Sequence, residues 1–332
     1  MNYWFEAVVK PSLMVFSTLL LARIFVVAGL GSWLESVLSK ASRKNFGTLW
    51  FFAAFFSAAV LTISFTAYAM VPLLEKIEMP QSQKTKIMVE TLFAAAAGSA
   101  IMPFANIHNV FLALRYHVAL PQFVKAILPM WMVLMLVGFF IARPKEMFLR
   151  KKVLFSWKKL NKFDFLIGIL ALAILTLTFL GAIPPMICFA TIAVLSLMVG
   201  PIRTVFPRLD RWVFSFAALS FLIFGAVRNI LPIKPLTTIQ SFFGTAFVSQ
   251  VSNNLWITSI LSGKADFLGA VWGANVASVG MPWASLSAIT FVLVAIKYRV
   301  MFDGKVLLRK CMTMFLVAVP VTFLTMKLLK TT

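Results

Sequence analysis

"MPFAN", at Met102–Asn106, returns as "MPWAS" at Met281–Ser285 in a chain of 332 residues. Each copy reads Met-Pro, an aromatic residue, Ala and a small polar residue. A serine precedes each Met by three positions, at Ser99 and Ser278. A proline inside a helix removes a backbone donor and frees carbonyl groups. The repeated motif therefore predicts two helices that are broken at equivalent places.

The chain is 61% hydrophobic and only 12% charged, which is more apolar surface than a soluble domain can hide. Residues 165–202 carry no charge, and Gly181–Pro185 interrupts this run near its middle. Each half has roughly 18–20 residues, long enough for a helix that crosses a bilayer. The composition thus predicts an all-α polytopic membrane protein. Cys188 and Cys311 both fall in apolar runs and are expected to be core residues.

The hydropathy pattern predicts about eight full crossings. Their expected residues are 12–34, 87–114, 121–142, 164–182, 184–201, 212–231, 267–296 and 306–328. Two further uncharged runs, 45–74 and 235–263, are too long for one crossing and too short for two crossings with a turn. Near their middles lie the polar residues Thr62 and Ser64, and Ser252, Asn253 and Asn254. Each run is therefore expected to be a re-entrant hairpin, with one long tilted helix as the alternative.

Positive charge sets the expected orientation in the membrane. Residues 143–163 hold eight Lys and Arg residues, and the loops on the same side bring the cytoplasmic total to 22, against eight outside. Both chain termini are then outside, in a protein of the cytoplasmic membrane. The net charge of +21 lies in short loops between apolar runs, which argues against a nucleic-acid partner. The lipid bilayer is the expected environment.

The order crossing, hairpin, broken crossing and crossing occurs twice with opposite orientations, so an inverted repeat is expected. The first repeat spans 1–142 and the second spans 212–332. A basic cytoplasmic linker at 143–163 and a scaffold helix pair at 164–211 separate them. The first hairpin opens to the cytoplasm and the second to the outside. The two proline motifs then break their crossings near the midplane, where half-helix ends are exposed.

Two hairpin tips and two broken helices that meet at a pseudo-two-fold axis favour a binding site with alternating access. Half-helix N-termini suit an anion, while carbonyls with Asn and Ser oxygens suit a small cation such as Na⁺. The expected substrate-binding residues are Thr62, Ser64, Pro103, Asn106, Asn109, Ser252, Asn253, Asn254, Pro282 and Ser285. Ser252 and Asn253 are also the expected cation ligands. The alternative is that such residues only join neighbouring helices.

Residues 98–112, "GSAIMPFANIHNVFL", resemble the pattern G-S-x-x-T-P-x-G-N-P-x-N-x-x of the ion transporter superfamily, in particular its divalent anion:sodium symporters and the arsenite and citrate permeases. "SQVSNN" at 249–254 and "GANVASVGMPWASLS" at 273–287 resemble its second hairpin tip and second helix break. The resemblance covers nearly the whole chain from about Phe16. It implies an elevator-type secondary transporter, commonly a homodimer, that moves small anions such as dicarboxylates with sodium.

The chain departs from the family pattern at several positions. Ile63 stands where the family has the Asn of its first tip, while Asn253 keeps the Asn of the second. The other departures, Thr to Met, Gly to Ala and Pro to Ile, are at Met102, Met281, Ala105 and Ile107. The resemblance therefore implies a cation site near Asn253 more than near Ile63. Relatives carry further N-terminal scaffold helices that residues 1–11 do not supply, so a divergent, N-terminally short member is expected.

Four titratable residues lie in or beside the expected crossings. Glu90, near the cytoplasmic start of its helix, is expected either to act in function or simply to reach the interface. Arg23 lies in mid-span and needs a partner or a wet cavity, with structural pairing favoured over substrate contact. His108 follows the first break and is expected to be a satisfied polar residue, with a proton carrier or anion ligand as the alternative. His117 is expected at the interface.

These patterns favour an anion transporter with no cofactor and with Na⁺ or H⁺ as the coupling ion. The alternative is a transport-incompetent relative that acts as a scaffold or sensor, which the altered first tip favours. A membrane enzyme is disfavoured, because the chain has only ten acids and no two of them lie within one helical turn of each other inside a membrane segment.

Overall fold

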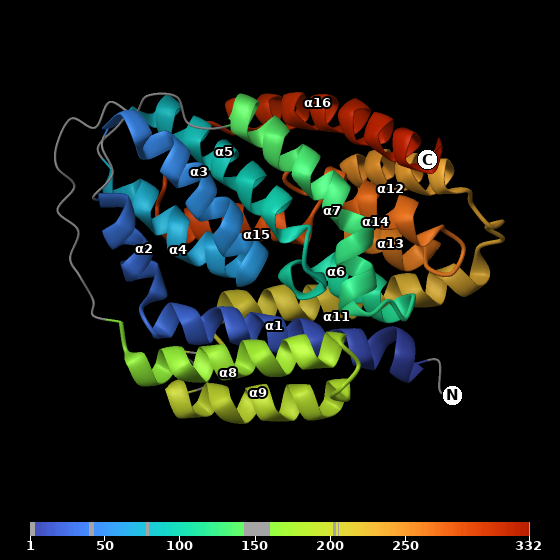
Figure 1. Ribbon diagram of the computed structural model, residues 1–332, viewed down its shortest axis with the longest axis horizontal. Coiled ribbons are helices and arrows are strands. Elements are labelled where there is room, and N and C mark those ends of the chain that lie inside the picture. The colour runs from blue at the N-terminus through green and yellow to red at the C-terminus, as the bar shows by residue number, and fades with distance from the viewer. Residues whose placement is uncertain are drawn as a thin grey trace.

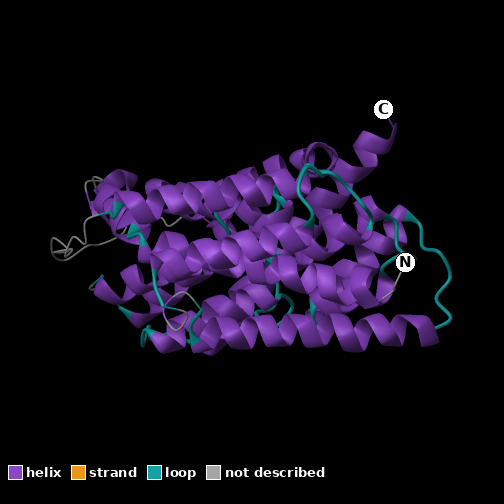
Figure 2. Cartoon of the chain, turned by 90° about the horizontal axis from the view of Figure 1, so that it is seen from below, coloured by secondary structure: helices purple, strands orange, loops and turns teal. Residues whose placement is uncertain are grey.

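The computed structural model describes residues 4–39, 43–77, 80–142, 160–201, 204 and 206–331. This part of the chain is helical, without strands, as the all-α prediction requires (Figure 2). Most of the expected basic linker at 143–163 lies outside the described residues. The helical elements are η1 (Phe5–Val9), α1 (Lys10–Val27), α2 (Leu30–Ser39), α3 (Arg43–Val60), α4 (Ile63–Lys76), α5 (Gln81–Ser99), η2 (Pro103–Ala105), α6 (Ile107–Arg115), α7 (Leu120–Val137), η3 (Gly138–Ala142), α8 (Lys162–Phe179), α9 (Pro185–Val199), α11 (Arg208–Ile230), α12 (Thr238–Val251), α13 (Asn254–Leu261), α14 (Phe267–Ala277), α15 (Leu286–Lys297) and α16 (Gly304–Thr331).

Among the described residues, five helical segments are long and apolar enough to cross a membrane. They are η1 with α1, α7 with η3, α8, α11 and α16. The other three expected crossings correspond to the shorter apolar helix α9 and to the broken pairs α5–α6 and α14–α15. The protein is therefore an all-α polytopic membrane protein, as predicted.

The first crossing differs from its expected position at 12–34. Its helix spans Phe5–Val27, as η1 and α1, and the chain turns at Gly29, whose φ of 87° is in the left-handed region. Glycine adopts this conformation without a steric penalty from a Cβ atom. The residues after this turn form a separate helix, α2, which packs against α4. The hydropathy pattern merged the two helices because both are apolar.

Both long uncharged runs are hairpins of two helices. The first bends at Leu61–Thr62, and the Thr62 hydroxyl caps α4 by accepting the N–H of Phe65 at 3.0 Å. The second bends at Ser252–Asn253, and the Asn253 amide oxygen caps α13 by accepting the N–H of Leu255 at 3.0 Å. Such caps satisfy free donors of the new helix. The alternative of single tilted helices is therefore wrong.

Both proline motifs interrupt a crossing, as predicted. In the first repeat, α5 ends, Pro103 begins the short helix η2, and α6 follows. In the second repeat, eight residues without α-helix separate α14 from α15, and they include Pro282. Both prolines are buried. Each break leaves helix ends whose backbone groups need partners from elsewhere in the chain.

The two hairpins enter the bundle from opposite ends of its long axis (Figure 1). α3 and α4 lie at the end where α8 begins, whereas α12 and α13 lie at the end that holds both chain termini. α1, α8 and α9 pack side by side along one edge, and α7 and α16 pack together along the opposite edge. We call α1, α8, α9 and α11 the frame, and α3–α7 with α12–α16 the repeat body. Opposed hairpins are the arrangement of an inverted repeat.

Equivalent helices approach each other closely in both repeats. α3 packs along α5, and α12 packs along α14. A Cβ atom at Gly98 would overlap the carbonyl oxygen of Phe55, and one at Gly273 would overlap that of Phe242. Small residues permit such backbone contact between membrane helices. In each repeat, the first arm of the hairpin is thereby fixed to the first half of the broken helix.

Candidate functional site

The two broken helices meet through a pair of asparagines. Asn109, in the first turn of α6, and Asn275, near the end of α14, exchange side-chain hydrogen bonds of 2.9 and 3.3 Å. Both side chains are fully buried. Because α6 belongs to the first repeat and α14 to the second, this pair joins the two helix breaks. The sequence analysis identifies Asn109 but not Asn275, although an Asn within the apolar helix before "MPWAS" is a visible signal.

His108 connects this pair to the tip of the second hairpin. Its Nε2 lies 3.2 Å from Asn275 Oδ1, and its Nδ1 lies 3.1 Å from Asn254 Nδ2. A neutral imidazole with its proton on Nε2 satisfies both contacts, because it donates to the oxygen and accepts from the amide. Asn254 Nδ2 also lies 2.9 Å from Ser278 Oγ. His108 is thus a satisfied polar residue, the favoured interpretation of the sequence.

A second link between the repeats lies at the first break. Asn106 immediately precedes α6, and its Oδ1 accepts the hydroxyl of Ser287, in α15, at 2.8 Å. Its Nδ2 donates to Ser99 Oγ at 3.3 Å. Ser285, the equivalent residue of "MPWAS", instead caps α15 by accepting the N–H of Ser287 at 3.2 Å. The repeated motif places equivalent residues at equivalent breaks, but their partners differ.

Side-chain amides satisfy carbonyl groups that the breaks leave free. At the end of α5, Asn109 Nδ2 lies 3.3 Å from the carbonyl oxygen of Ala100. At the end of α14, Gln250 Nε2 lies 3.3 Å from the carbonyl oxygen of Ala277, and Gln250 Oε1 accepts the N–H of Met281 at 2.8 Å. An unpaired backbone group inside a membrane protein is costly, so these amides stabilise the breaks. The sequence analysis does not identify Gln250.

The second tip holds its two predicted cation ligands in other interactions. Asn253 uses its side-chain oxygen as the cap of α13, and its Nδ2 donates to the carbonyl of Trp283 at 2.8 Å. The hydroxyl of Ser252 donates to the carbonyl of Val248, in its own helix, at 2.8 Å. Within the described ranges no three of His, Cys, Asp and Glu come together as a metal site. A cation here would therefore depend on neutral oxygens that are released from these hydrogen bonds.

The first tip has different neighbours from the second. Thr62 and Ser64 are buried, and the hydrogen bonds of Thr62 run to Phe65 and Thr66 within α4. α4 packs mainly against α15, α5 and α3, whereas α13 packs mainly against α11, α12 and α6. Direct side-chain hydrogen bonds therefore join the second tip, through Asn254, to the broken helices of both repeats.

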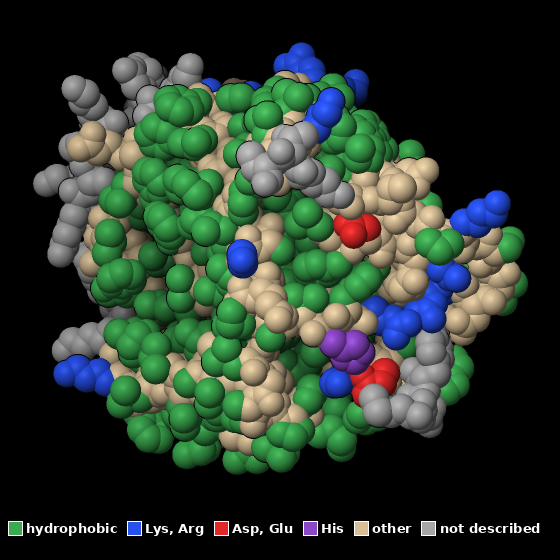
Figure 3. Space-filling view, turned by 45° about the vertical axis from the view of Figure 1, so that its right-hand side comes forward, with side chains coloured by type: hydrophobic (Ala, Val, Ile, Leu, Met, Phe, Trp, Pro, Cys, Tyr) green, Lys and Arg blue, Asp and Glu red, His purple; other side chains and the backbone are tan. Residues whose placement is uncertain are grey.

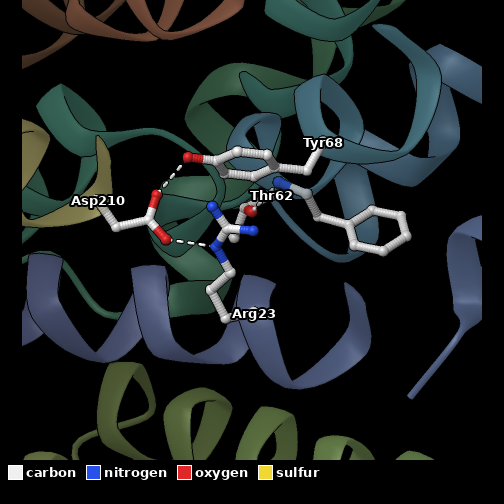
Figure 4. A network of polar contacts seen from close by, with 5 residues as sticks. Arg23, Thr62, Tyr68 and Asp210 are labelled. Carbon is white, nitrogen blue, oxygen red and sulfur yellow. Dashed lines mark hydrogen bonds and ion pairs between the residues drawn. The ribbon is translucent and has the colours of Figure 1, made fainter. Parts of the chain in front are cut away.

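Arg23 has a charged partner that the sequence analysis does not identify. Its Nε donates to Asp210, at the start of α11, and Tyr68 of α4 donates to the other carboxylate oxygen at 2.5 Å (Figure 4). The guanidinium carbon lies 3.4 Å from the centre of the Tyr68 ring. All three residues are buried. The favoured interpretation of Arg23, structural pairing, is confirmed.

This charged cluster of Arg23, Asp210 and Tyr68 joins the frame to the first hairpin. Arg23 belongs to α1 and Asp210 to α11, both frame helices, and Tyr68 belongs to α4 of the first hairpin (Figure 4). A buried ion pair is favourable only when further hydrogen bonds support it, and Tyr68 supplies one of them to Asp210. In the described part of the chain, Arg23 Nη2 is buried and makes no hydrogen bond. The sequence does carry a visible signal for Asp210, since it is an acid at the start of an expected crossing.

Glu90 and His117 lie in contrasting surroundings. Glu90 is buried in α5, with one carboxylate oxygen 3.9 Å from the Nζ of Lys86. Its other oxygen has no hydrogen bond among the described residues. His117 is exposed in the turn after α6, as an interfacial residue would be. Glu90 is therefore a buried acid and not an exposed interfacial one.

A second repeated motif follows the broken helices: "RYHV" at 115–118 and "KYRV" at 297–300. His117 and Arg299 have left-handed φ values of 53° and 55°, and the following valine N–H bonds back to Ala113 and Ala295 respectively, both at 2.9 Å. These are Schellman helix ends. α15 has 12 residues and α6 has nine, so the two motifs are not equally spaced from the proline motifs. A search for motifs that recur at one constant spacing along the sequence therefore misses this repeat.

A cavity of about 470 Å³ lies where the frame meets the repeat body. From the frame it is lined by Lys10 and the α8–α9 turn at Gly181, and from the repeat body by Ala113 and His117. Figure 3 shows a largely hydrophobic face, with a histidine close to acidic and basic side chains at its lower right. The boundary between the frame and the repeat body is thus incompletely filled at this end.

The central polar cluster consists of His108, Asn106, Asn109, Asn254, Asn275, Ser278 and Ser287, and all its members are buried. Amide N–H groups and half-helix N-termini suit oxyanions, while amide and hydroxyl oxygens suit small cations. Such a neutral cluster can change partners without exposing a bare charge to hydrocarbon. No protein-family model matches this sequence, and no curated protein sequence matches it. The inference of function therefore rests on the geometry of the helix breaks.

Proposed function

We propose that the protein is a secondary active transporter that moves a small anion, a di- or tricarboxylate or a similar oxyanion, across the cytoplasmic membrane. The supporting observation is that the broken helices of two inverted repeats meet in the central polar cluster, which the second hairpin tip joins through Asn254. Secondary transporters of several folds place substrate between such repeats, at discontinuous helices. Elevator-type alternating access would move the repeat body against the frame.

The chemistry of the cluster fits an anion better than a cation alone. Its amides and the N-termini of α6 and α15 supply hydrogen-bond donors, which a carboxylate accepts. The cavity between frame and repeat body gives the two parts room to shift relative to each other. Coupling to Na⁺ or H⁺ supplies the driving force. For Na⁺, Asn253 is the proposed ligand, and binding would exchange the N–H of Leu255 for the cation.

The experiment is uptake of labelled succinate, citrate and sulfate into proteoliposomes that contain the purified protein. An inward sodium or proton gradient is expected to drive uptake at least tenfold above protein-free liposomes. Asn275→Ala is expected to abolish this uptake, whereas Lys125→Gln, at an exposed site on α7, is the matched control and is expected to retain it. The proposal would be contradicted if none of the three anions entered the proteoliposomes faster than protein-free liposomes, whether or not a gradient was present.

The coupling ion is tested by two substitutions at the hairpin tips. Asn253→Ala removes a neutral oxygen from the proposed sodium site, and a small hard cation needs about six oxygens. It is expected to abolish the sodium dependence of uptake. Ile63→Asn restores an amide at the first tip and is expected to preserve or steepen that dependence. A sodium response that survives Asn253→Ala unchanged would place the cation elsewhere or make H⁺ the coupling ion.

One observation favours the second candidate, a non-transporting scaffold or sensor. Asn253 and the central polar cluster are fully engaged in hydrogen bonds within the protein, as in a structure that need not open. A sensor would bind an anion without moving it. Two measurements distinguish a sensor from a transporter. For a sensor, an anion raises the Tm of the purified protein, but no gradient drives uptake of that anion.

A further inference from the structure

A second cavity, of about 410 Å³, lies between α11 of the frame and α15 of the repeat body. We call it the basic groove, and its lining residues are Arg208, Leu209 and Trp212 of α11 with Leu293, Ile296 and Lys297 of α15. Arg208, Trp212, Ile296 and Lys297 are exposed, so the groove opens at the surface of the protein. None of the described residues that line it belongs to the central polar cluster.

The basic groove is amphipathic along the helix axes. Arg208 is the first residue of α11 and Lys297 is the last residue of α15, so one cation stands at the end of each wall. The other four lining residues are hydrophobic and lie further inside the two helices. The Trp212 ring stacks on Phe216, with ring centres 5.5 Å apart, which fixes one apolar wall. A ligand that fits has an anionic head at the helix ends and a hydrocarbon part beside the helices.

The two cations stand on the side of the membrane that is predicted to be cytoplasmic. α8 follows the basic linker, and α8 and α9 pack as a pair, so α11 begins at the end of the bundle where α8 begins (Figure 1). The positive charges of the linker predict that this end is cytoplasmic. The cytoplasmic leaflet carries anionic lipids, whose headgroups bind in basic pockets between membrane helices on this side. Trp212 is of the residue type that is enriched at membrane interfaces.

The charges around the basic groove favour an anion. Asp210, the acid next to this groove in the sequence, accepts hydrogen bonds from Arg23 and Tyr68 in the charged cluster. Lys297 is within electrostatic range of both Arg23 and Asp210, whose opposite charges largely cancel. A guanidinium has five N–H donors and an ammonium has three. A phosphate can therefore bind both cations while they keep contacts within the protein, such as that of Lys297 Nζ with the Tyr298 ring at 5.6 Å.

We propose that the basic groove binds an anionic phospholipid of the cytoplasmic leaflet. Its phosphate lies at Arg208 and Lys297, and its acyl chains lie along the apolar walls. Because α11 belongs to the frame and α15 to the repeat body, the bound lipid bridges these two parts. It therefore stabilises the relative position that they have in this structure. This site goes beyond the proposed transport function and does not depend on it.

The test is thermal unfolding of the purified full-length protein in neutral detergent, titrated with phosphatidylglycerol or with phosphatidylcholine. Phosphatidylglycerol is expected to give the larger rise in Tm, because a ligand that binds only the folded state stabilises it. Arg208→Gln and Lys297→Gln are each expected to weaken the apparent affinity for phosphatidylglycerol about fivefold. Lys305→Gln is the matched control. It removes an exposed positive charge at the start of α16, outside the groove, and is expected to leave this affinity unchanged.

The apolar walls are tested without a change of charge. Leu293→Trp fills part of the groove and is expected to weaken the apparent affinity for phosphatidylglycerol at least fivefold. Leu293→Met keeps the side-chain volume and is expected to retain this affinity. The Tm of each variant in detergent without added lipid measures any loss of stability that is independent of lipid. An unchanged lipid response in Leu293→Trp would show that the acyl chains do not occupy the groove and would overturn the proposal.

The cation variants give four further outcomes that would overturn it. The first is an equal rise in Tm with both lipids. The second is a phosphatidylglycerol response that the double variant Arg208→Gln with Lys297→Gln retains in full. The third is an equal weakening by Lys305→Gln, which would show that only the total charge matters. The fourth is an equal rise in Tm with sodium glycerol phosphate, which would show that the groove takes a soluble phosphate and not a lipid.

Discussion

The two hairpin tips have equivalent positions in the repeats and opposite chemical surroundings. The helix that follows the first tip carries Tyr68, which donates to Asp210 in the buried charged cluster with Arg23 (Figure 4). Asn254, at the second tip, contacts the neutral side chains of His108 and Ser278. The charged cluster connects its hairpin to the frame. The neutral cluster connects its hairpin to the helix breaks.

This difference predicts that the contacts of the two hairpins differ in how costly they are to break. Separating a buried ion pair exposes a charge to a poorly solvating interior, which costs several kcal/mol for each ion. Exchanging one neutral hydrogen-bond partner for another costs far less, about 1 kcal/mol. We therefore expect the contact between the first hairpin and the frame to be the most costly one to break when the repeat body moves, and the second tip to be the part that rearranges when a ligand binds.

The largest expected effect concerns Asp210→Ala. It leaves the Arg23 guanidinium buried without its counter-ion, and the free energy of unfolding is expected to fall by about 3–5 kcal/mol. The double variant Arg23→Met with Asp210→Leu removes both charges and is expected to recover most of this loss. Chemical unfolding in detergent measures both. Equal destabilisation of the single and double variants would show that the pair is not energetically coupled.

The next effect tests whether the hairpin arms are equivalent despite their different tips. Gly98→Ala and Gly273→Ala each place a methyl group against a backbone carbonyl that has no room to move, and each is expected to cost about 3 kcal/mol of unfolding free energy. Gly244→Ala, where the nearest atom to a new Cβ is 4.0 Å away, is the matched control. Because alanine favours helix, this control is expected to be neutral or stabilising. If the two substitutions lowered the free energy of unfolding by unequal amounts, the hairpin arms of the two repeats would not be energetically equivalent.

The smallest effect compares the tips themselves. Asn254→Ala removes the amide that reaches His108 and Ser278 and is expected to cost about 2 kcal/mol, because buried polar atoms lose their partner. Thr62→Ala removes only a local helix cap and is expected to cost about 1 kcal/mol. Thermal unfolding of the two variants under one set of conditions gives the comparison. If Thr62→Ala destabilised the protein more than Asn254→Ala, the first tip and not the second would be the more strongly connected of the two.

The sequence predicts much of this fold because span length and local polarity leave a periodic record. The lengths of the uncharged runs and their polar centres are sufficient to predict both hairpins. The proline motifs predict both helix breaks. Gly29 is missed as a turn because a single glycine within an apolar run does not by itself end a helix. The sequence signals that predict the hairpins and the helix breaks are therefore local ones, and they concern backbone conformation.

The partners within the site are harder to predict from sequence. Asn109, Asn106 and Asn254 are identified because they lie beside a predicted break or tip. Asn275 and Asp210 are not, because their roles come from residues 166 and 187 positions away, Asn109 and Arg23 respectively. Local patterns carry no information on such pairings unless the three-dimensional packing is known. The prediction that Asn253 binds a cation remains a prediction.

The links between the repeats also constrain how the protein is made. Asn106 and Asn109 find their partners Ser287 and Asn275 only 181 and 166 residues later in the chain. A ribosome needs roughly 10–30 s to synthesise that length. During this time the side-chain oxygens of Asn106 and Asn109 lack the partners that the second repeat supplies, and an unpaired polar group in hydrocarbon is costly. The first broken helix therefore reaches its final hydrogen bonding only after the second repeat has been made.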